Sequence, residues 1–407
     1  MLNNYLKIAY CALLRSKFFS ALNIIGLAVG IALGMLIGSY VWSEFQVNRQ
    51  LRNAGQQYIV QSKWKQENMG LDFTTLAPFG QALKMQYPTL VADAYAFYGV
   101  SATISHDNNH FRESIQIGDS SLLTMYGFKL LHGDPRTALT QPNSLVITET
   151  IARKFFGRTD VLNQSLTLET PQSGKQQFVV TGVLERPSPN SVTQLLAEAA
   201  EVFMAPGALP YFGGNLTDWT NVYIPTYVEL QPGVLPSDLA KPLAQLIATN
   251  APPDTQKNLI AYLTPLTDYY LKSNNGLVRR MIHTLGWVAI FILLMAAINF
   301  VNLSLGSAST RLREIGVRKA LGGLRRQLAT QFLLEALVLM LIATGLSVGL
   351  YALFRPVFSE VVGKTIPSLG DLPGTYMGLT LAMVLSVGLL AGGTPHYIFR
   401  PTHQSTL

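Results

Sequence analysis

Cysteine is almost absent from this chain, because Cys11 is the only one among 407 residues. A disulfide framework within the chain is therefore excluded, and a large exported domain must be held together by its apolar core alone. Catalytic signatures are missing as well, since no Gly-x-Ser-x-Gly, no His-Glu-x-x-His and no paired cysteine and histidine motif occurs. We therefore expect no catalytic, cofactor-binding or metal-binding residues in this chain.

Charge is also scarce, at 13% of residues, and it is missing from the centres of four long apolar runs. As a helix, about 20 apolar residues cross the roughly 30 Å hydrocarbon core of a bilayer. We predict transmembrane helices at residues 18–43, about 284–305, about 330–353 and about 375–393. Without central charges, these helices offer no proton relay or ion path.

The loop between the second and third runs is strongly basic and fixes the predicted topology. It carries one acid, Glu314, among the basic residues Arg311, Arg313, Arg318, Lys319, Arg325 and Arg326. Short basic loops stay on the cytoplasmic side, so we expect both termini to be cytoplasmic and residues 44–280 to lie outside. Lys272, Arg279 and Arg280 are discordant, because they precede the second run on the outer side. The net charge of +7 indicates contact with anionic lipid rather than nucleic acid.

Residues 44–280 have the composition of a separate α+β domain, long enough for two lobes. A helical piece is expected at Ile151–Phe156, between short β-like runs at Tyr58–Gln61, Ser144–Thr148, Gln177–Leu184 and Val222–Leu230. His106 and His110 would share one face of a helix, as metal ligands could. The intervening Asp-Asn-Asn is typical of turns, however, and favours a solvated hairpin tip.

The first apolar run has a glycine at every fourth position, namely Gly26, Gly30, Gly34 and Gly38. Steps of four keep these glycines on one helix face, where they allow another helix to approach closely. We therefore expect this face to pack against another membrane helix.

Four polar residues flank the basic loop in the membrane: Asn299, Asn302, Gln331 and Glu335. A carboxylate facing lipid would be costly, so Glu335 should point into the protein or toward a partner. The two asparagines are candidates for hydrogen bonds between helices.

The basic loop itself favours a short helix at about residues 308–323. Arg311, Glu314 and Arg318 fall at i, i+3 and i+7, and Glu314 precedes Arg318 by four residues, the favourable order for an ion pair. Gly322-Gly323 then ends the helix. One side offers charge and the other small apolar groups that could dock in a groove. A basic helix lying on the membrane surface is the alternative interpretation.

These motifs resemble those of the FtsX/MacB-type ABC transporter permeases. The matching segments of the membrane part are Asn299-Phe-Val-Asn-Leu-Ser304, Arg311–Gly323 and Gln331-Phe-Leu-Leu-Glu335. The outer domain is similar to the MacB-like periplasmic core domain, through Leu131-His-Gly-Asp134, Pro142–Thr148, Ala152–Gly157 and Val180-Thr-Gly-Val183. The first run also matches the family through Ser20–Gly30, so the resemblance covers nearly the whole chain.

The resemblance implies a fold of four transmembrane α-helices with a large α+β periplasmic domain between the first and second. Its parts would be a basic segment 1–17, helix 18–43, a periplasmic domain 44–280 with an inserted lobe at about 115–228, and a permease domain 281–407. It implies a coupling helix made of Arg311, Arg313, Glu314, Ile315, Gly316, Val317, Arg318, Lys319, Ala320, Leu321, Gly322 and Gly323.

The implied function is that of a non-catalytic membrane subunit in the bacterial inner membrane. It would transmit motion from a separate ATPase chain, which alone binds ATP, to the periplasmic domain, for efflux or for lipoprotein or peptide export. The implied partners are that ATPase, a second permease copy or homologous permease, the lipid bilayer, and an adaptor or outer-membrane protein. A regulator of cell-wall hydrolases, an anchored receptor or enzyme, and a truncated half of a duplicated permease are the alternatives, the last because the C-terminal sequence departs from the family pattern.

Overall fold

A computed structural model describes residues 17–398 apart from 67–69, 172, 196–197 and 310–324. The chain forms two compact units, one made of its N-terminal helix and its C-terminal third, the other of Gln46–Val278. We call them the membrane unit and the domain, and we describe each by itself.

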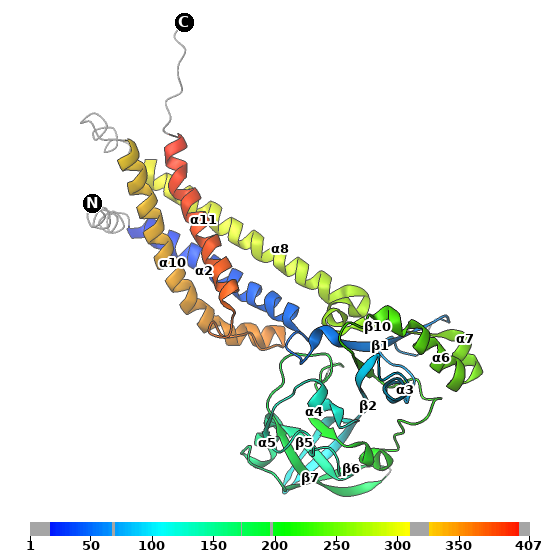
Figure 1. The fold of residues 1–407 in the computed structure, drawn as a ribbon. Helices are drawn as coiled ribbons and strands as arrows, with labels where there is room; N and C mark the ends of the chain where they lie inside the picture. Colours follow the sequence, from blue (N-terminus) through cyan, green and yellow to red (C-terminus); the bar gives the residue numbers. More distant parts are fainter. Residues whose placement is uncertain (1–16, 67–69, 172, 196–197, 310–324, 399–407) are drawn as a thin grey trace. The chain divides into compact units, whose positions relative to one another are not determined.

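The membrane unit consists of long helices that lie side by side (Figure 1). They are α2 (Lys17–Gln46), α8 (Leu266–Ser309), α10 (Arg325–Val362) and α11 (Gly374–Ile398). In the described part of the chain, three stretches are long and apolar enough to cross a membrane: Ser20–Gln46, Asn275–Ser304 and Leu333–Val362. The fourth predicted span falls in α11, whose apolar stretch Gly374–Ser386 is shorter.

The domain is built on strands that share one ten-stranded sheet. They are β1 (Gln57–Trp64), β2 (Val91–His106), β3 (Asn109–Gly118), β4 (Leu130–His132), β5 (Ser144–Thr148), β6 (Ser165–Thr170), β7 (Gly174–Leu184), β8 (Val202–Met204), β9 (Thr226–Leu230) and β10 (Leu259–Pro265). Their order is β10-β1-β9-β2-β3-β8-β5-β7-β4, and β6 pairs with both β2 and β7. Because β6 joins β2 to β7, strands β2, β3, β8, β5, β7 and β6 close into a ring.

Apolar side chains fill the ring, and helices pack against the sheet, α3 and α6 on its open part and α5 on the ring. They are α3 (Phe79–Gln86), α4 (Ser121–Met125), α5 (Glu149–Phe156), α6 (Ala240–Asn250) and α7 (Pro253–Asn258), with 3₁₀ turns at Ala54–Gln56, Pro206–Phe212 and Pro236–Leu239. Leu83 of α3 and Leu246 of α6 pack in one cluster with Val60 and Val228 of the open sheet. A second cluster contains Ile151 and Phe155 of α5 together with side chains of the ring.

The predicted α+β character of this region is confirmed, and most of the predicted elements are present. Strand β5 has the predicted bounds, and the expected helix at Ile151–Phe156 is the end of α5. Thr148 caps α5 by accepting a hydrogen bond from the Ile151 amide, which explains where the helix begins. The strand predicted at Val222–Leu230 is present but shorter, since β9 begins at Thr226 and Ile224 makes only an isolated bridge to Thr75.

The interpretation of His106–His110 as a hairpin tip is confirmed. His106 pairs with Asn109 and Ser105 with His110 across the β2–β3 turn. Directly opposed residues share a face and neighbours alternate, so the two imidazoles lie on opposite faces of the hairpin. A shared metal ion between them is thereby excluded.

Candidate functional site

The predicted coupling helix, residues 308–323, lies almost entirely outside the described residues, as does the side chain of Gln331. What the structure describes is the other predicted group, the residues assigned to packing between membrane helices. These residues, together with a buried hydrogen-bonded junction inside the domain, form the candidate functional site.

Three of the four α2 glycines lie against α8. A Cβ atom at Gly26 would lie 3.2 Å from the Asn299 amide nitrogen, and one at Gly34 would lie 2.8 Å from the Leu293 side chain. At Gly30 a Cβ atom would collide with the Cβ of Ala296. Any larger side chain would therefore push the two helices apart, and the glycines set their separation.

Gly38, the fourth glycine, lies against α11 instead. A Cβ atom there would lie 2.7 Å from the Tyr376 hydroxyl, which donates a hydrogen bond of 2.9 Å to the Met35 carbonyl of α2. The missing side chain thus gives Tyr376 access to the helix backbone. Two neighbouring helices use the same glycine face, α8 along most of its length and α11 near its C-terminal end.

A second tyrosine joins α10 to α2. The Tyr351 hydroxyl donates to the Pro367 carbonyl at 2.7 Å and also lies 3.2 Å from the Ser39 hydroxyl. Both Ser39 and Tyr351 are buried. Buried hydroxyls of this kind are stabilising only when they are paired, so this contact holds α2, α10 and the loop before α11 in register.

Glu44 and Lys364 form an ion pair at the domain-side end of the membrane unit. Their N–O distance is 2.6 Å, and the Glu44 side chain is 2% exposed while that of Lys364 is 45% exposed. The Tyr40 hydroxyl is also hydrogen-bonded to Glu44. A buried carboxylate needs such partners, because its desolvation would otherwise be strongly unfavourable.

The remaining predicted packing residues are Asn299, Asn302 and Glu335. Asn299 lies beside Gly26 but is exposed, and Asn302 is exposed too. Glu335 is half-buried on α10. Their proposed hydrogen bonds between helices stay a prediction.

Sequence reasoning missed a buried asparagine, Asn48, which connects the segment where the chain enters the domain to the segment where it leaves. The Asn48 amide donates to the Leu266 carbonyl at 2.7 Å and to the Ser191 hydroxyl at 3.0 Å, and its oxygen accepts from the Ser191 amide at 2.6 Å. Asn48 follows α2, and Leu266 begins α8. Its backbone is left-handed (φ 68°), a conformation that asparagine tolerates better than most residues.

The first residue of α8, Leu266, is therefore hydrogen-bonded to the segment that follows α2. The Tyr227 hydroxyl of β9 extends this link by donating to the Ser191 carbonyl at 2.7 Å. Helix α8 comprises Leu266–Ser309, and its backbone is left-handed at Asn275 (φ 56°) and Gly276 (φ 71°). Asn48, Ser191 and Tyr227 thus form one hydrogen-bonded chain within the domain.

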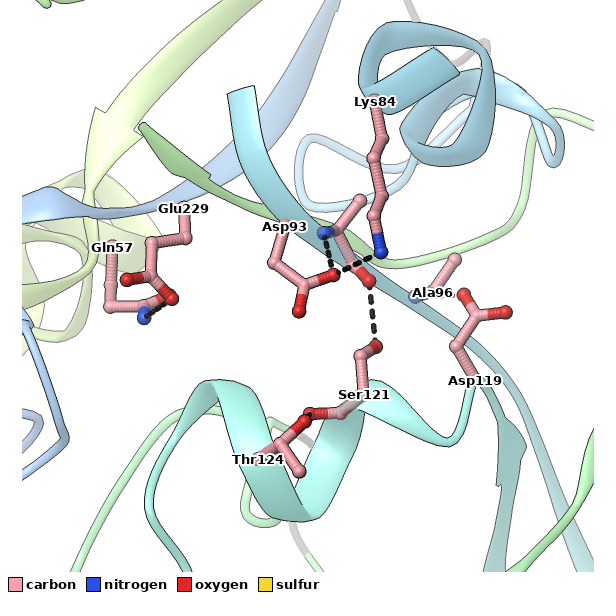
Figure 2. A network of polar contacts seen from close by, with 9 residues as sticks. Gln57, Lys84, Asp93, Ala96, Asp119, Ser121, Thr124 and Glu229 are labelled. Atoms are coloured by element: carbon pink, nitrogen blue, oxygen red, sulfur yellow. Dashed lines mark hydrogen bonds and ion pairs between the residues drawn. The ribbon is translucent and has the colours of Figure 1, made fainter. Parts of the chain in front are cut away.

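A polar network lies between α3, β2 and α4 of the domain (Figure 2). Lys84 and Asp93 form an ion pair of 2.7 Å, and the Ser121 hydroxyl donates to the Ala94 carbonyl. Asp119 accepts a hydrogen bond from the Ala96 amide at 3.2 Å. Burial raises the pKa of the Asp119 carboxyl, although hydrogen bonds and nearby Lys84 oppose this effect.

We expect Asp119→Asn to stabilise the protein at neutral pH but not at low pH. Because the folded-state pKa of Asp119 is raised, its contribution to stability is fully present below about pH 4 and is lost as pH rises through the folded value. The gain of the variant over the wild type should therefore increase between about pH 4 and pH 7. Thermal unfolding of both proteins across this range checks the sign, and a gain that falls with rising pH would contradict it.

In the part of the chain that the structure describes, no group of three or more His, Cys, Asp and Glu residues could hold a metal ion. The described geometry is one of helix contacts and hydrogen-bonded junctions. It can fix helices at close range.

Comparison with known proteins adds two family models that match consecutive parts of the chain. The MacB-like periplasmic core domain matches residues 20–246, and the FtsX-like permease C-terminal domain matches residues 286–401. The MacB macrolide export ATP-binding/permease protein of Rhodopseudomonas palustris is 30% identical over 45% of this chain and 29% of its own length. The ABC transporter permease YknZ of Bacillus subtilis is 26% identical over 60% of this chain and 56% of its own.

The chain thus spans between about a third and just over half of the length of these relatives. Among solved structures, the periplasmic region of MacB from Actinobacillus actinomycetemcomitans is similar with 12% identity and a TM-score of 0.40. That match covers 58% of this chain and 95% of the solved one.

Proposed function

Since this chain belongs to the FtsX/MacB-type ABC transporter permeases, we propose that it transmits ATP-driven motion from an ATPase subunit to its α+β domain. The observation that carries this proposal is that the two connections of the domain to the membrane helices meet at Asn48, which follows α2 and donates a hydrogen bond to the carbonyl of Leu266, the first residue of α8. A movement of either connection would therefore reach the domain at one buried, hydrogen-bonded point. Transport through a central pore would instead need polar groups at the centres of the spans.

The proposal includes a topology and partners. Four spans, with α11 as the fourth, would place both termini in the cytoplasm and the domain in the periplasm of a bacterial inner membrane. The basic segment Arg311–Gly323 would dock on a separate ATPase chain, which supplies ATP binding and hydrolysis. A second permease copy or a homologous permease would complete the membrane part, and an adaptor or outer-membrane protein would contact the domain. The relatives named as macrolide exporters support efflux as the kind of transport that this chain serves.

The coupling segment gives the direct test of this function. Glu314→Lys/Arg318→Glu, or Gly316→Trp, should prevent the ATPase subunit from co-purifying with the chain and should lower its stimulated ATP hydrolysis at least about tenfold, the equivalent of 1.4 kcal/mol. Membrane insertion should be unchanged, because these residues lie outside the predicted spans.

A matched charge reversal serves as the control. Glu169→Lys/Lys175→Glu exchanges an exposed ion pair across the β6–β7 hairpin and leaves the net charge constant. This variant should retain the ATPase subunit. Full coupling in the Glu314/Arg318 variant would show that the basic segment is not the docking element.

A further inference from the structure

The membrane unit contains an apolar crevice that the proposed function does not use. It has a volume of about 270 Å³ and lies between α2, α8, α10 and α11. Its floor is made of buried side chains, among them Leu27 and Met35 of α2. Two of its lining residues, Ile290 of α8 and Leu379 of α11, are 51% and 69% exposed. The crevice is therefore open sideways, toward the surface that a membrane protein presents to lipid.

The lining of this crevice is almost entirely apolar. An unfilled apolar space loses the dispersion contacts of its walls, and water has no hydrogen-bond partners there. In a bilayer the surrounding medium is acyl chain, which fills such a space without desolvation of polar groups. The lining of α2 extends from Val41 to Leu27, a rise of about 21 Å, so the crevice is elongated along the membrane normal like an extended acyl chain.

Two basic side chains of α8 lie beyond the end of the crevice that is nearer to the domain along the chain. Arg279 and Arg280 are exposed, and neither has an ion-pair partner among the described residues. Arg279 precedes the lining residue Gly286 by seven residues, two helical turns, so both lie on one stripe of α8. This separation is about 10 Å along the axis. The headgroup layer is about 5–8 Å thick on each side of the hydrocarbon, so the guanidinium groups fall at the level of lipid phosphates.

We propose that the crevice holds one acyl chain of a phospholipid from the leaflet on the domain side, with its phosphate on Arg279 and Arg280. The arginines are two of the three basic residues that run against the expected charge distribution of an outer segment, and the third, Lys272, is paired with Asp268. A phosphate partner accounts for their position. The inference requires only that the membrane unit spans a bilayer, and it is independent of any ATPase.

Gly286 provides a selective way to close the crevice. It lines the crevice, and a Cβ atom there would meet nothing within 4 Å. Gly286→Leu should therefore fill the space without disturbing helix contacts. Gly349 on α10 is the matched control, because a Cβ atom there also meets nothing within 4 Å and it does not line the crevice.

The test is native mass spectrometry of the full chain, delipidated in detergent and titrated with phosphatidylglycerol. The wild type and Gly349→Leu should bind one lipid per chain, whereas Gly286→Leu should bind it at least tenfold more weakly. Arg279→Gln and Arg280→Gln should each weaken binding about fivefold. Arg112→Gln on the β2–β3 hairpin should leave it unchanged. Thermal unfolding checks that all variants remain folded.

Equal lipid binding by Gly286→Leu and Gly349→Leu would overturn the proposal. So would a wild type that binds no lipid above the detergent background. A change in oligomeric state for Gly286→Leu, with lipid binding intact, would assign the crevice to a second copy of the chain instead. Loss of ATPase coupling in the Glu314/Arg318 variant has no bearing on any of these outcomes, so the two proposals fail separately.

Discussion

Gly30→Ala should destabilise the membrane unit by about 1–3 kcal/mol, the usual cost of forcing an extra group into a packed contact. The added methyl would collide with the Cβ of Ala296 on α8, whose backbone Cα is only 3.9 Å away. Neither helix can relieve the collision by rotating a flexible side chain. Helices α2 and α8 must instead separate, which also weakens the flanking contacts at Gly26 and Gly34. Thermal or denaturant unfolding of the full chain in detergent measures the loss.

The control substitution for this prediction should leave the free energy of unfolding unchanged or increase it. Gly345 of α10 has open space where its Cβ would lie, so Gly345→Ala should be neutral or stabilising by up to about 1 kcal/mol through helix propensity alone. Adding Ala296→Gly to Gly30→Ala moves the methyl from one helix to the other and should recover most of the lost stability. If the double variant were as unstable as Gly30→Ala, the contact with Ala296 would not be the cause.

The spacing of the α2 glycines could be predicted from the sequence, but their partners could not. A period of four identifies one helix face whatever packs on it. Which helix approaches depends on the tertiary arrangement, and here Gly30 and Gly34 lie against α8 while Gly38 lies against α11. The sequence offers one hint, since Tyr376 follows Gly374 at the start of an apolar run and its hydroxyl needs a partner in the membrane.

The domain is a similar case, with predictable strands and unpredictable junctions. Short apolar runs revealed β1, β5 and β7, because such runs follow directly from burial of one or both sheet faces. Asn48 carries no such pattern. Its three hydrogen bonds reach residues as far along the chain as Ser191 and Leu266, and polar contacts between distant segments leave no period in the sequence. The basic segment Arg311–Gly323 differs from Asn48, because its motif is recognisable in the sequence while its structure lies outside the described residues.

Lys364→Met should destabilise the membrane unit by about 2 kcal/mol. Removing one partner of a fully buried ion pair typically costs about 3–5 kcal/mol, because the other charge is left without compensation. Glu44 is almost completely buried and keeps its hydrogen bond from Tyr40, whereas Lys364 is partly exposed, so we expect a loss below this range. Lys272→Met is the matched control. It removes an exposed ion pair with Asp268 on α8 and should change stability by less than about 0.5 kcal/mol.

A double-mutant cycle separates the buried charge from the lost lysine contacts. Glu44→Gln keeps the shape of the side chain and removes its charge, so it also removes the reason that Lys364 is needed. The combined variant Glu44→Gln/Lys364→Met should therefore be more stable than Lys364→Met alone, which is the non-additivity expected of a directly coupled pair. If the two changes were additive, the ion pair would contribute nothing to holding the loop before α11 against α2. In that case the Tyr351 and Tyr376 hydroxyls, which reach Pro367 and Met35, would have to hold this end of the unit.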